Sequence, residues 1–149
     1  MTADNALKEL SLAECMSLLR ETKVGRIATV SNSFPVVMPV NYGVVERHGR
    51  TWFALRTRPG NVIDQGSVQH VALQIDCIDG VHHTGWSVLV RGTLQRVDPD
   101  AADFRARFDP QPWFDHDRDA WLVLEPLAIT GRALHPAETE WAFSASAYL

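Results

Sequence analysis

The sequence predicts a mainly β protein, a six-stranded antiparallel barrel with short peripheral helices. About six β-rich segments follow one another along the 149 residues. Most of them are joined by connections of hairpin length, which favours an antiparallel sheet over a βαβ fold. Closing such a sheet into a barrel removes its free edges. The length suits one domain, so we expect residues 1–149 to form a single unit.

The N-terminal part of the chain predicts a helix followed by the first strand. After a polar lead-in over residues 1–10, Ser11 and Glu14 have the spacing of a capping box and precede an apolar segment. This pattern predicts a helix that starts at this point. Residues 24–30 predict a strand, and residues 31–33 predict a tight turn.

A long β-rich segment runs from residue 34 to residue 45 and contains Pro35 and Pro39. Proline cannot donate a hydrogen bond to a neighbouring strand, so we expect this strand to be bent, bulged or at an edge. Residues 46–50 predict a hairpin turn, and residues 51–57 predict the returning strand.

The second half of the chain predicts three more strands. Residues 59–68 are ambiguous and have room for one or two helical turns. Strands are expected over residues 70–79, 86–97 and 120–134, the last of them broken near Pro126. The alternation in the first of these strands places four side chains on one face, namely Val71, Leu73, Ile75 and Cys77.

The connections in this half carry further expectations. Gly92 predicts a bulge or a close approach of another backbone. Residues 101–108 predict a helix, and residues 109–119 predict a loop that contains Trp113. The amphipathic segment from residue 136 to residue 149 is compatible with a short helix.

Composition and charge exclude several classes of partner. The net charge of −4 and the pI of about 5.8 provide no positive field for nucleic acid. The N-terminus lacks the pattern of a signal peptide, and the longest apolar runs are too short to span a membrane. Cys15 and Cys77 form no CxxC pair, so we interpret both as small buried side chains in a reducing compartment. We therefore expect a cytoplasmic protein that binds neither nucleic acid nor membranes.

The end of the strand over residues 51–57 carries a candidate anion site. The strand leads into a turn with Arg56, Thr57, Arg58, Gly60 and Asn61. Guanidinium groups, a hydroxyl and free backbone N–H groups around a glycine are the donors that an anion needs. The alternative is an ordinary loop with two solvated arginines, because short motifs carry a high risk of false positives.

Six segments in this order resemble the pyridoxamine 5′-phosphate oxidase-like, FMN-binding split β-barrel family, in particular its small single-domain actinobacterial members. The segments are VGRIA (24–28), PVNY (39–42), LRTRPG (55–60), VALQID (71–76), GWSVLVRG (85–92) and ITGR (129–132). The resemblance covers a core of roughly residues 8–134 and leaves residues 135–149 as a C-terminal tail.

The resemblance implies a homodimer with two FMN sites built at the subunit interface. The positions that match the flavin-contacting segments are Arg26, Ile27, Ala28, Val40, Asn41, Tyr42, Leu55, Arg56, Thr57, Trp86 and Ser87, and the turn with Arg58, Gly60 and Asn61 would hold the phosphate. The chain departs from its relatives at Val62, where a lysine or arginine is usual. A hydrocarbon cannot pair with a phosphate dianion, and the loss of one charge-assisted contact costs about 1.5–3 kcal/mol.

The resemblance therefore implies a flavin-dependent oxidoreductase that acts on a small molecule of unknown identity, with no catalytic acid or base assigned. The alternatives are a deazaflavin-dependent reductase and a non-catalytic dimer that binds a flavin or another anion. Pyridoxamine 5′-phosphate oxidase activity itself is not expected, because residues 138–149 lack the family's C-terminal substrate segment. His82 and His83 do not predict a metal site, since adjacent side chains of an extended segment point to opposite sides.

Overall fold

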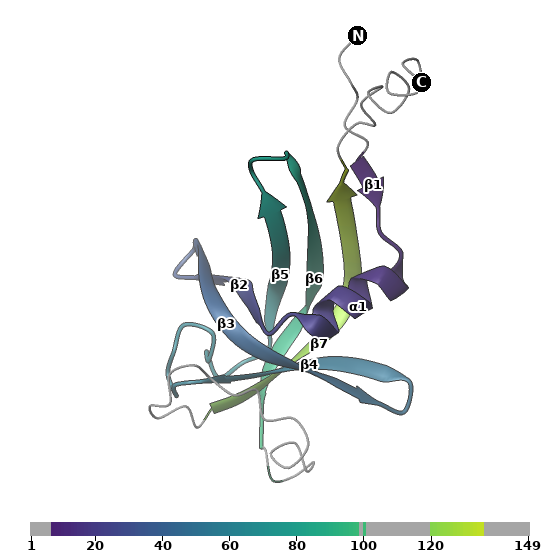
Figure 1. Cartoon of the computed structure of the whole chain (residues 1–149). Helices are drawn as coiled ribbons and strands as arrows, with labels where there is room; N and C mark the ends of the chain where they lie inside the picture. The colour runs from purple at the N-terminus through teal and green to yellow at the C-terminus, as the bar shows by residue number, and fades with distance from the viewer. Residues whose placement is uncertain (1–6, 99, 101–119, 136–149) are drawn as a thin grey trace, which may run out of the picture.

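The computed structural model describes residues 7–98, 100 and 120–135. These residues form one short helix and seven strands (Figure 1). In chain order the elements are β1 (Leu7–Glu9), α1 (Leu12–Glu21), β2 (Val24–Ser31), β3 (Phe34–Arg47), β4 (Arg50–Thr57), β5 (Gln69–Asp79), β6 (Thr84–Val97) and β7 (Ala120–Leu134). The helix, loop and tail expected over residues 101–119 and 136–149 lie outside the described residues.

Antiparallel pairing joins the strands in the order β1-β7-β4-β3-β2-β5-β6, and a further pairing between β6 and β7 closes the sheet on itself. Six strands thus form the barrel, which confirms the expected mainly β architecture. The seventh strand, β1, is an addition that the polar lead-in did not reveal. It pairs residues 7–9 with the C-terminal end of β7.

The two halves of β7 have different neighbours along one edge. Residues 120–124 pair with β4, whereas residues 132–134 pair with β1. The helix α1 follows β1 directly and packs against β7, and the N–H of Leu10 donates to the carbonyl of Gly131 at 2.9 Å. The barrel is therefore split between β4 and β1, with α1 beside the split (Figure 1).

The capping box predicted for α1 is present. The Glu14 carboxylate accepts from the N–H of Ser11 at 2.7 Å, and the Ser11 hydroxyl accepts from the N–H of Glu14 at 3.2 Å. The hydrogen bond from the Ser11 backbone lowers the pKa of Glu14. The helix buries Cys15, Met16 and Leu19 in the barrel core, so its apolar side closes the interior.

The prolines of β3 lie at an edge, which is one of the three arrangements that the sequence predicted for this strand. Residues 34–41 of β3 pair with β2, and residues 42–47 pair with β4. Pro35 and Pro39 belong to the first half, which in the described part of the chain pairs with β2 on one side and with no strand on the other. Proline is tolerated at such an edge, because no neighbouring strand on the open side needs a backbone N–H donor. The hairpins at either end of β3 turn through residues with positive φ, at Asn32–Ser33 and at His48–Gly49.

Two expectations about the middle of the chain were wrong. Residues 58–68 contain turns and bends rather than helix. Cys77 is exposed, although Val71, Leu73 and Ile75 on the same strand are buried as expected. The reason is that the β5–β6 hairpin extends past the barrel (Figure 1), where Ile78 is 74% exposed as well. Period-two alternation predicts the face of a side chain but not where the core ends.

The break expected near Pro126 is a bulge within a continuous strand. Arg91 pairs with Ala128 and Gly92 pairs with Pro126, so Leu127 is an extra residue on β7. A Cβ atom at Gly92 would lie 2.0 Å from the carbonyl oxygen of Glu125. The close backbone approach predicted for Gly92 is therefore confirmed. In the part of the chain that the structure describes, no helix is long and apolar enough to cross a membrane.

We expect Gly92→Ala to destabilise the barrel by about 1–3 kcal/mol, because the new methyl group meets backbone atoms that must move. Gly80→Ala is the matched control, since a Cβ atom there meets nothing within 4 Å. Urea denaturation of both variants measures the difference. Equal stability of the two variants would contradict the close approach.

Candidate functional site

The closed sheet has an outer face on which side chains of four strands lie in cross-strand rows. The register aligns Arg26, Gln74, Leu89 and Thr130 in one row, with Ala28, Ala72, Arg91 and Ala128 on one side of it and Asp76, Ser87 and Arg132 on the other. These eleven residues are called the outer face below. Side chains of alternate residues point to the same side of a sheet, so all eleven face away from the core.

A carboxylate organises the polar part of the outer face. Asp76 Oδ2 accepts from Gln74 Nε2 at 2.9 Å and lies 3.4 Å from Arg26 Nη1. Arg26 comes from β2, whereas Gln74 and Asp76 come from β5. The contact holds the Arg26 guanidinium, which is 57% exposed, above the β2–β5 pairing.

Two hollows open on the outer face. The larger has a volume of about 650 Å³, and residues of β1, β5, β6 and β7 line it: Leu7, Glu9, Gln74, Ser87, Leu89, Thr130, Gly131 and Arg132. The smaller, of about 360 Å³, is mainly apolar and includes Ala28, Val30, Pro35, Ala72, Arg91 and Leu127 in its lining. Residues of β5 and β6 contribute to the lining of both hollows.

Four of the predicted flavin contacts lie on this side of the sheet. Arg26, Ala28 and Ser87 belong to the outer face, and Asn41 pairs with Val24 at its margin. Val24 and Arg26 are two residues apart on β2, so Asn41 faces the same side as the Arg26 guanidinium. The structure thus brings these four positions to one surface.

Six other predicted contacts point into the barrel. Ile27, Tyr42 and Leu55 belong to the buried core, Val40 and Trp86 pack against it, and Thr57 is 4% exposed. The Tyr42 hydroxyl donates to the carbonyl of Leu19 near the end of α1 at 2.8 Å, and burial raises its pKa. These side chains are therefore turned away from a ligand on the outer face.

The remaining predicted contacts belong to the end of β4 and the turn after it. The Arg56 guanidinium stacks on the Trp121 ring, 5.1 Å from its centroid. Arg58 is exposed, and Gly60 has a φ of +75° that favours glycine. Asn61 donates from its backbone to the carbonyl of Arg58 at 3.0 Å.

The backbone donors expected to be free in this turn are in use. Gly60 N–H donates to Asp64 Oδ2 at 3.0 Å, Ile63 N–H to Asn61 Oδ1 at 3.3 Å, and Asp64 N–H to the Asn61 carbonyl at 2.7 Å. The expectation of free N–H groups around Gly60 was therefore wrong. Two side chains of the turn take part, because the Asp64 carboxylate accepts from Gly60 and the Asn61 side chain accepts from Ile63.

Val62 and Ile63 anchor this turn to the barrel. Ile63 is 1% exposed and belongs to the core, and Val62 packs against it. Val62, where the sequence resemblance implies a basic residue, thus makes a packing contact with the core.

A buried polar network that the sequence did not reveal supports the same segment. Gln69 Nε2 donates to the carbonyl of Ile63 at 2.8 Å, and Gln69 Oε1 accepts from the Thr29 hydroxyl at 2.9 Å. Gln65 Nε2 donates to the carbonyls of Val62 and Val30. The only signal for this network was a pair of glutamines just before an apolar strand.

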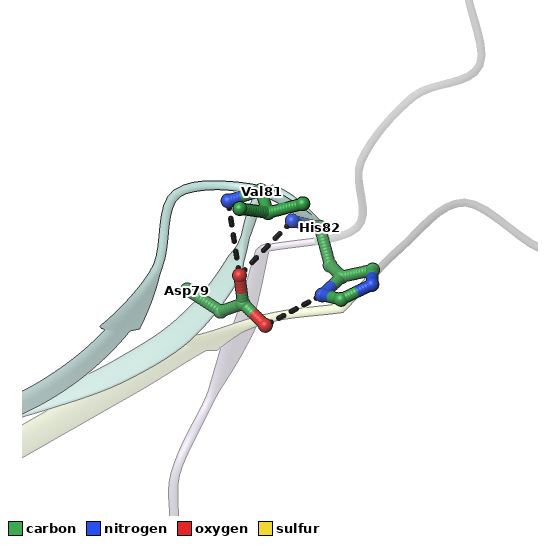
Figure 2. Close-up of polar contacts among 3 residues, drawn as sticks. All are labelled: Asp79, Val81 and His82. Carbon is green, nitrogen blue, oxygen red and sulfur yellow. Dashed lines mark hydrogen bonds and ion pairs between the residues drawn. The ribbon is translucent and has the colours of Figure 1, made fainter.

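The tip of the β5–β6 hairpin holds the residues considered for metal binding (Figure 2). Asp79 Oδ1 accepts from the N–H groups of Val81 and His82 at 2.9 and 3.1 Å, and Asp79 Oδ2 lies 2.6 Å from His82 Nδ1. These contacts stabilise the turn. Among residues 7–98, 100 and 120–135, no three His, Cys, Asp or Glu side chains are grouped as metal ligands.

Comparison with known proteins gives matches over most of the chain. The family model described as "Pyridoxamine 5'-phosphate oxidase" matches residues 11–133. A Mycobacterium tuberculosis protein named "Uncharacterized protein Rv0080" is 33% identical over 130 residues, which are 83% of this chain and 82% of the relative.

Solved structures with the same fold include proteins named for a flavin. An FAD binding protein from Mycobacterium smegmatis is 26% identical with a TM-score of 0.61, covering 87% of this chain and 100% of that one. An FAD-binding protein from Mesorhizobium loti (20% identity, TM-score 0.66) and a conserved protein of unknown function from Corynebacterium diphtheriae (21%, 0.72) each cover 87% of this chain and 98% of their own. At identities of 20% and 21%, the likeness to the Mesorhizobium loti and Corynebacterium diphtheriae proteins shows the fold alone.

We expect the pKa of Asp79 to lie below its ordinary value, because the His82 ring and the backbone N–H groups stabilise the carboxylate. A lowered folded-state pKa means that the contact stabilises the hairpin above the unfolded pKa of about 3.9 and is lost as the pH falls through the folded value. A carboxyl-resolved NMR titration measures the pKa of Asp79 in the folded protein.

His82→Gln removes the ring contact and should raise the Asp79 pKa toward its ordinary value. His48→Asn, on the β3–β4 hairpin, is the control and should leave it unchanged. An unchanged Asp79 pKa in His82→Gln would contradict the contact.

Proposed function

Because the chain belongs to the pyridoxamine 5′-phosphate oxidase family, we propose that it binds a flavin on its outer face and works as a flavin-dependent oxidoreductase on a small-molecule substrate. The name of the FAD binding protein from Mycobacterium smegmatis supports a flavin as the cofactor. FMN is the flavin that the sequence resemblance implies.

The observation that carries the proposal is the 650 Å³ hollow. Its size lies within the roughly 300–1,000 Å³ of small-molecule sites. Leu89 offers an apolar contact for a flat ring, while Gln74, Ser87, Thr130 and Arg132 offer hydrogen bonds to its polar edge. The donor set therefore fits an isoalloxazine ring.

The bound flavin would supply the hydride-transfer chemistry, and the residues of this chain would bind and orient it. Asp76 positions Gln74, which lines the hollow, and Arg26, which the strand register places opposite Gln74. We assign no residue as a proton donor or acceptor for a substrate.

We further propose a homodimer that covers this surface. Large apolar side chains are exposed on the β2–β3 hairpin and at the β7 bulge: Val30 (60%), Phe34 (72%), Val37 (62%) and Leu127 (71%). Val30 and Leu127 also line the smaller hollow. Clusters of exposed apolar residues of this kind mark interaction surfaces, and a second copy placed here would enclose both hollows.

A deazaflavin-dependent reductase remains the second candidate. The observation in its favour is the turn after β4, whose Gly60 N–H is not free for a flavin phosphate. A deazaflavin cofactor is longer and acidic, so it would place its charged groups away from this turn. Tighter binding of deazaflavin than of FMN would favour this reading, and flavin binding without turnover of any reductant would favour a non-catalytic binding dimer.

We expect wild-type protein to bind FMN in an absorbance or fluorescence titration, and Arg26→Ala to bind it about tenfold more weakly, because one charge-assisted hydrogen bond is lost. Arg47→Ala is the matched control. Arg47 is an exposed arginine of the β3–β4 hairpin whose Nε donates to His48 at 3.2 Å.

The titration is repeated with riboflavin, FAD and deazaflavin. Binding of none of these cofactors to folded wild-type protein would refute the proposed function. Equal weakening by Arg26→Ala and Arg47→Ala would refute the placement on the outer face.

We expect light scattering to give the mass of two chains for wild-type protein and of one chain for Val37→Lys, because a buried unpaired lysine is costly at an interface. Ile78→Lys, at an equally exposed aliphatic position on the β5–β6 hairpin tip, should remain dimeric. A monomeric wild-type protein would contradict the interface.

A further inference from the structure

The turn after β4 holds an anion that belongs to the chain itself. Asp64 Oδ2 accepts from Gly60 N–H at 3.0 Å and lies 3.6 Å from Arg96 Nη1. The Asp64 side chain is 4% exposed, whereas Arg96 on β6 is 52% exposed. Gly60 and Arg96 are far apart in sequence and meet only at this carboxylate.

The groups that converge on Asp64 are the ones that bind phosphate in other proteins. The N–H of a positive-φ residue in a turn contributes to anion-binding concavities, and a guanidinium is a strong donor to a phosphoryl oxygen. Here the Gly60 N–H and the Arg96 guanidinium both face the Asp64 carboxylate. Asp64 follows Gly60 by four residues in the same turn. The position that an external phosphate would take is occupied.

The occupying carboxylate also repels a second anion. Asp64 Oδ1 is buried and has no hydrogen-bond partner in the part of the chain that the structure describes. Like charges repel more strongly in a buried site than in water, because screening there is weak. Ile63, which is 1% exposed, prevents the turn from swinging outward to offer a new set of donors.

We propose that Asp64 is a specificity-determining residue that keeps phosphoryl groups out of the turn after β4. Applied to a flavin, which rests on the proposed function, this means that the tail phosphate is not bound by Gly60 and its neighbours. The turn does not distinguish FMN from riboflavin, and any preference between them arises elsewhere on the protein.

The test uses inorganic phosphate as the probe and the amide NMR resonance of Gly60 as the readout, so it needs no flavin. In wild-type protein we expect no saturable shift of Gly60. Asp64→Asn keeps the shape of the side chain but removes its charge, so we expect phosphate to displace it from Gly60 N–H and to give a saturable shift, with binding at least about tenfold tighter than any binding by wild-type protein.

Asp64→Ser, which is smaller and also neutral, repeats the test in case the first variant does not fold. Asp79→Asn removes a carboxylate at the far hairpin and should behave as wild type. Saturable phosphate binding at Gly60 in wild-type protein would overturn the proposal. So would a folded neutral variant whose Gly60 resonance does not respond to phosphate.

A second arm compares FMN with riboflavin. We expect Asp64→Asn to shift the ratio of their dissociation constants about tenfold in favour of FMN. An unchanged ratio would overturn the proposal for flavins. If wild-type protein binds neither compound, the proposed function fails, while the phosphate arm still decides the role of Asp64.

Discussion

The pairing of β7 with β6 is the constraint on which the rest of the structure depends. It runs from Trp121 to Leu134 on β7 and closes the sheet. The opposite edge of β7 is shared between β4 and β1, which creates the split beside α1. The same pairing fixes the register of the outer face, because a slip of one residue would exchange outward and inward side chains along the strand. The bulge at Leu127 absorbs one extra residue without disturbing the rows beyond it.

This arrangement separates two regions that the sequence suggested as one site. The outer face carries Arg26 and Asp76 and, with Gln74 and Ser87, an open hollow, whereas the turn after β4 is anchored in the core by Ile63 and closed by Asp64. In the proposals above, the sheet would hold the flavin ring, and the turn would exclude a phosphoryl group.

The sequence predicted features that a residue type signals by itself and missed those that depend on how distant segments meet. Ser11 and Glu14 signal a capping box, proline signals an edge, bend or bulge, and Gly92 signals a bulge or close approach, although its partner Glu125 lies on another strand. The exposure of Cys77 depends on how far a hairpin extends beyond the core. The closure of the Gly60 turn depends on Asp64 and on an arginine of β6, and no local pattern records such a contact. The family resemblance implied which strands contact a flavin, but not which of their side chains face outward.

The most direct test of the central claim is an amide-resolved NMR titration of the wild-type protein with FMN. The account predicts that the resonances that shift belong to the outer face, above all Ala72, Gln74 and Leu89, while Gly60 in the turn after β4 stays unchanged. Shifts centred on the β4–β5 turn, or no shifts at any FMN concentration, would contradict it.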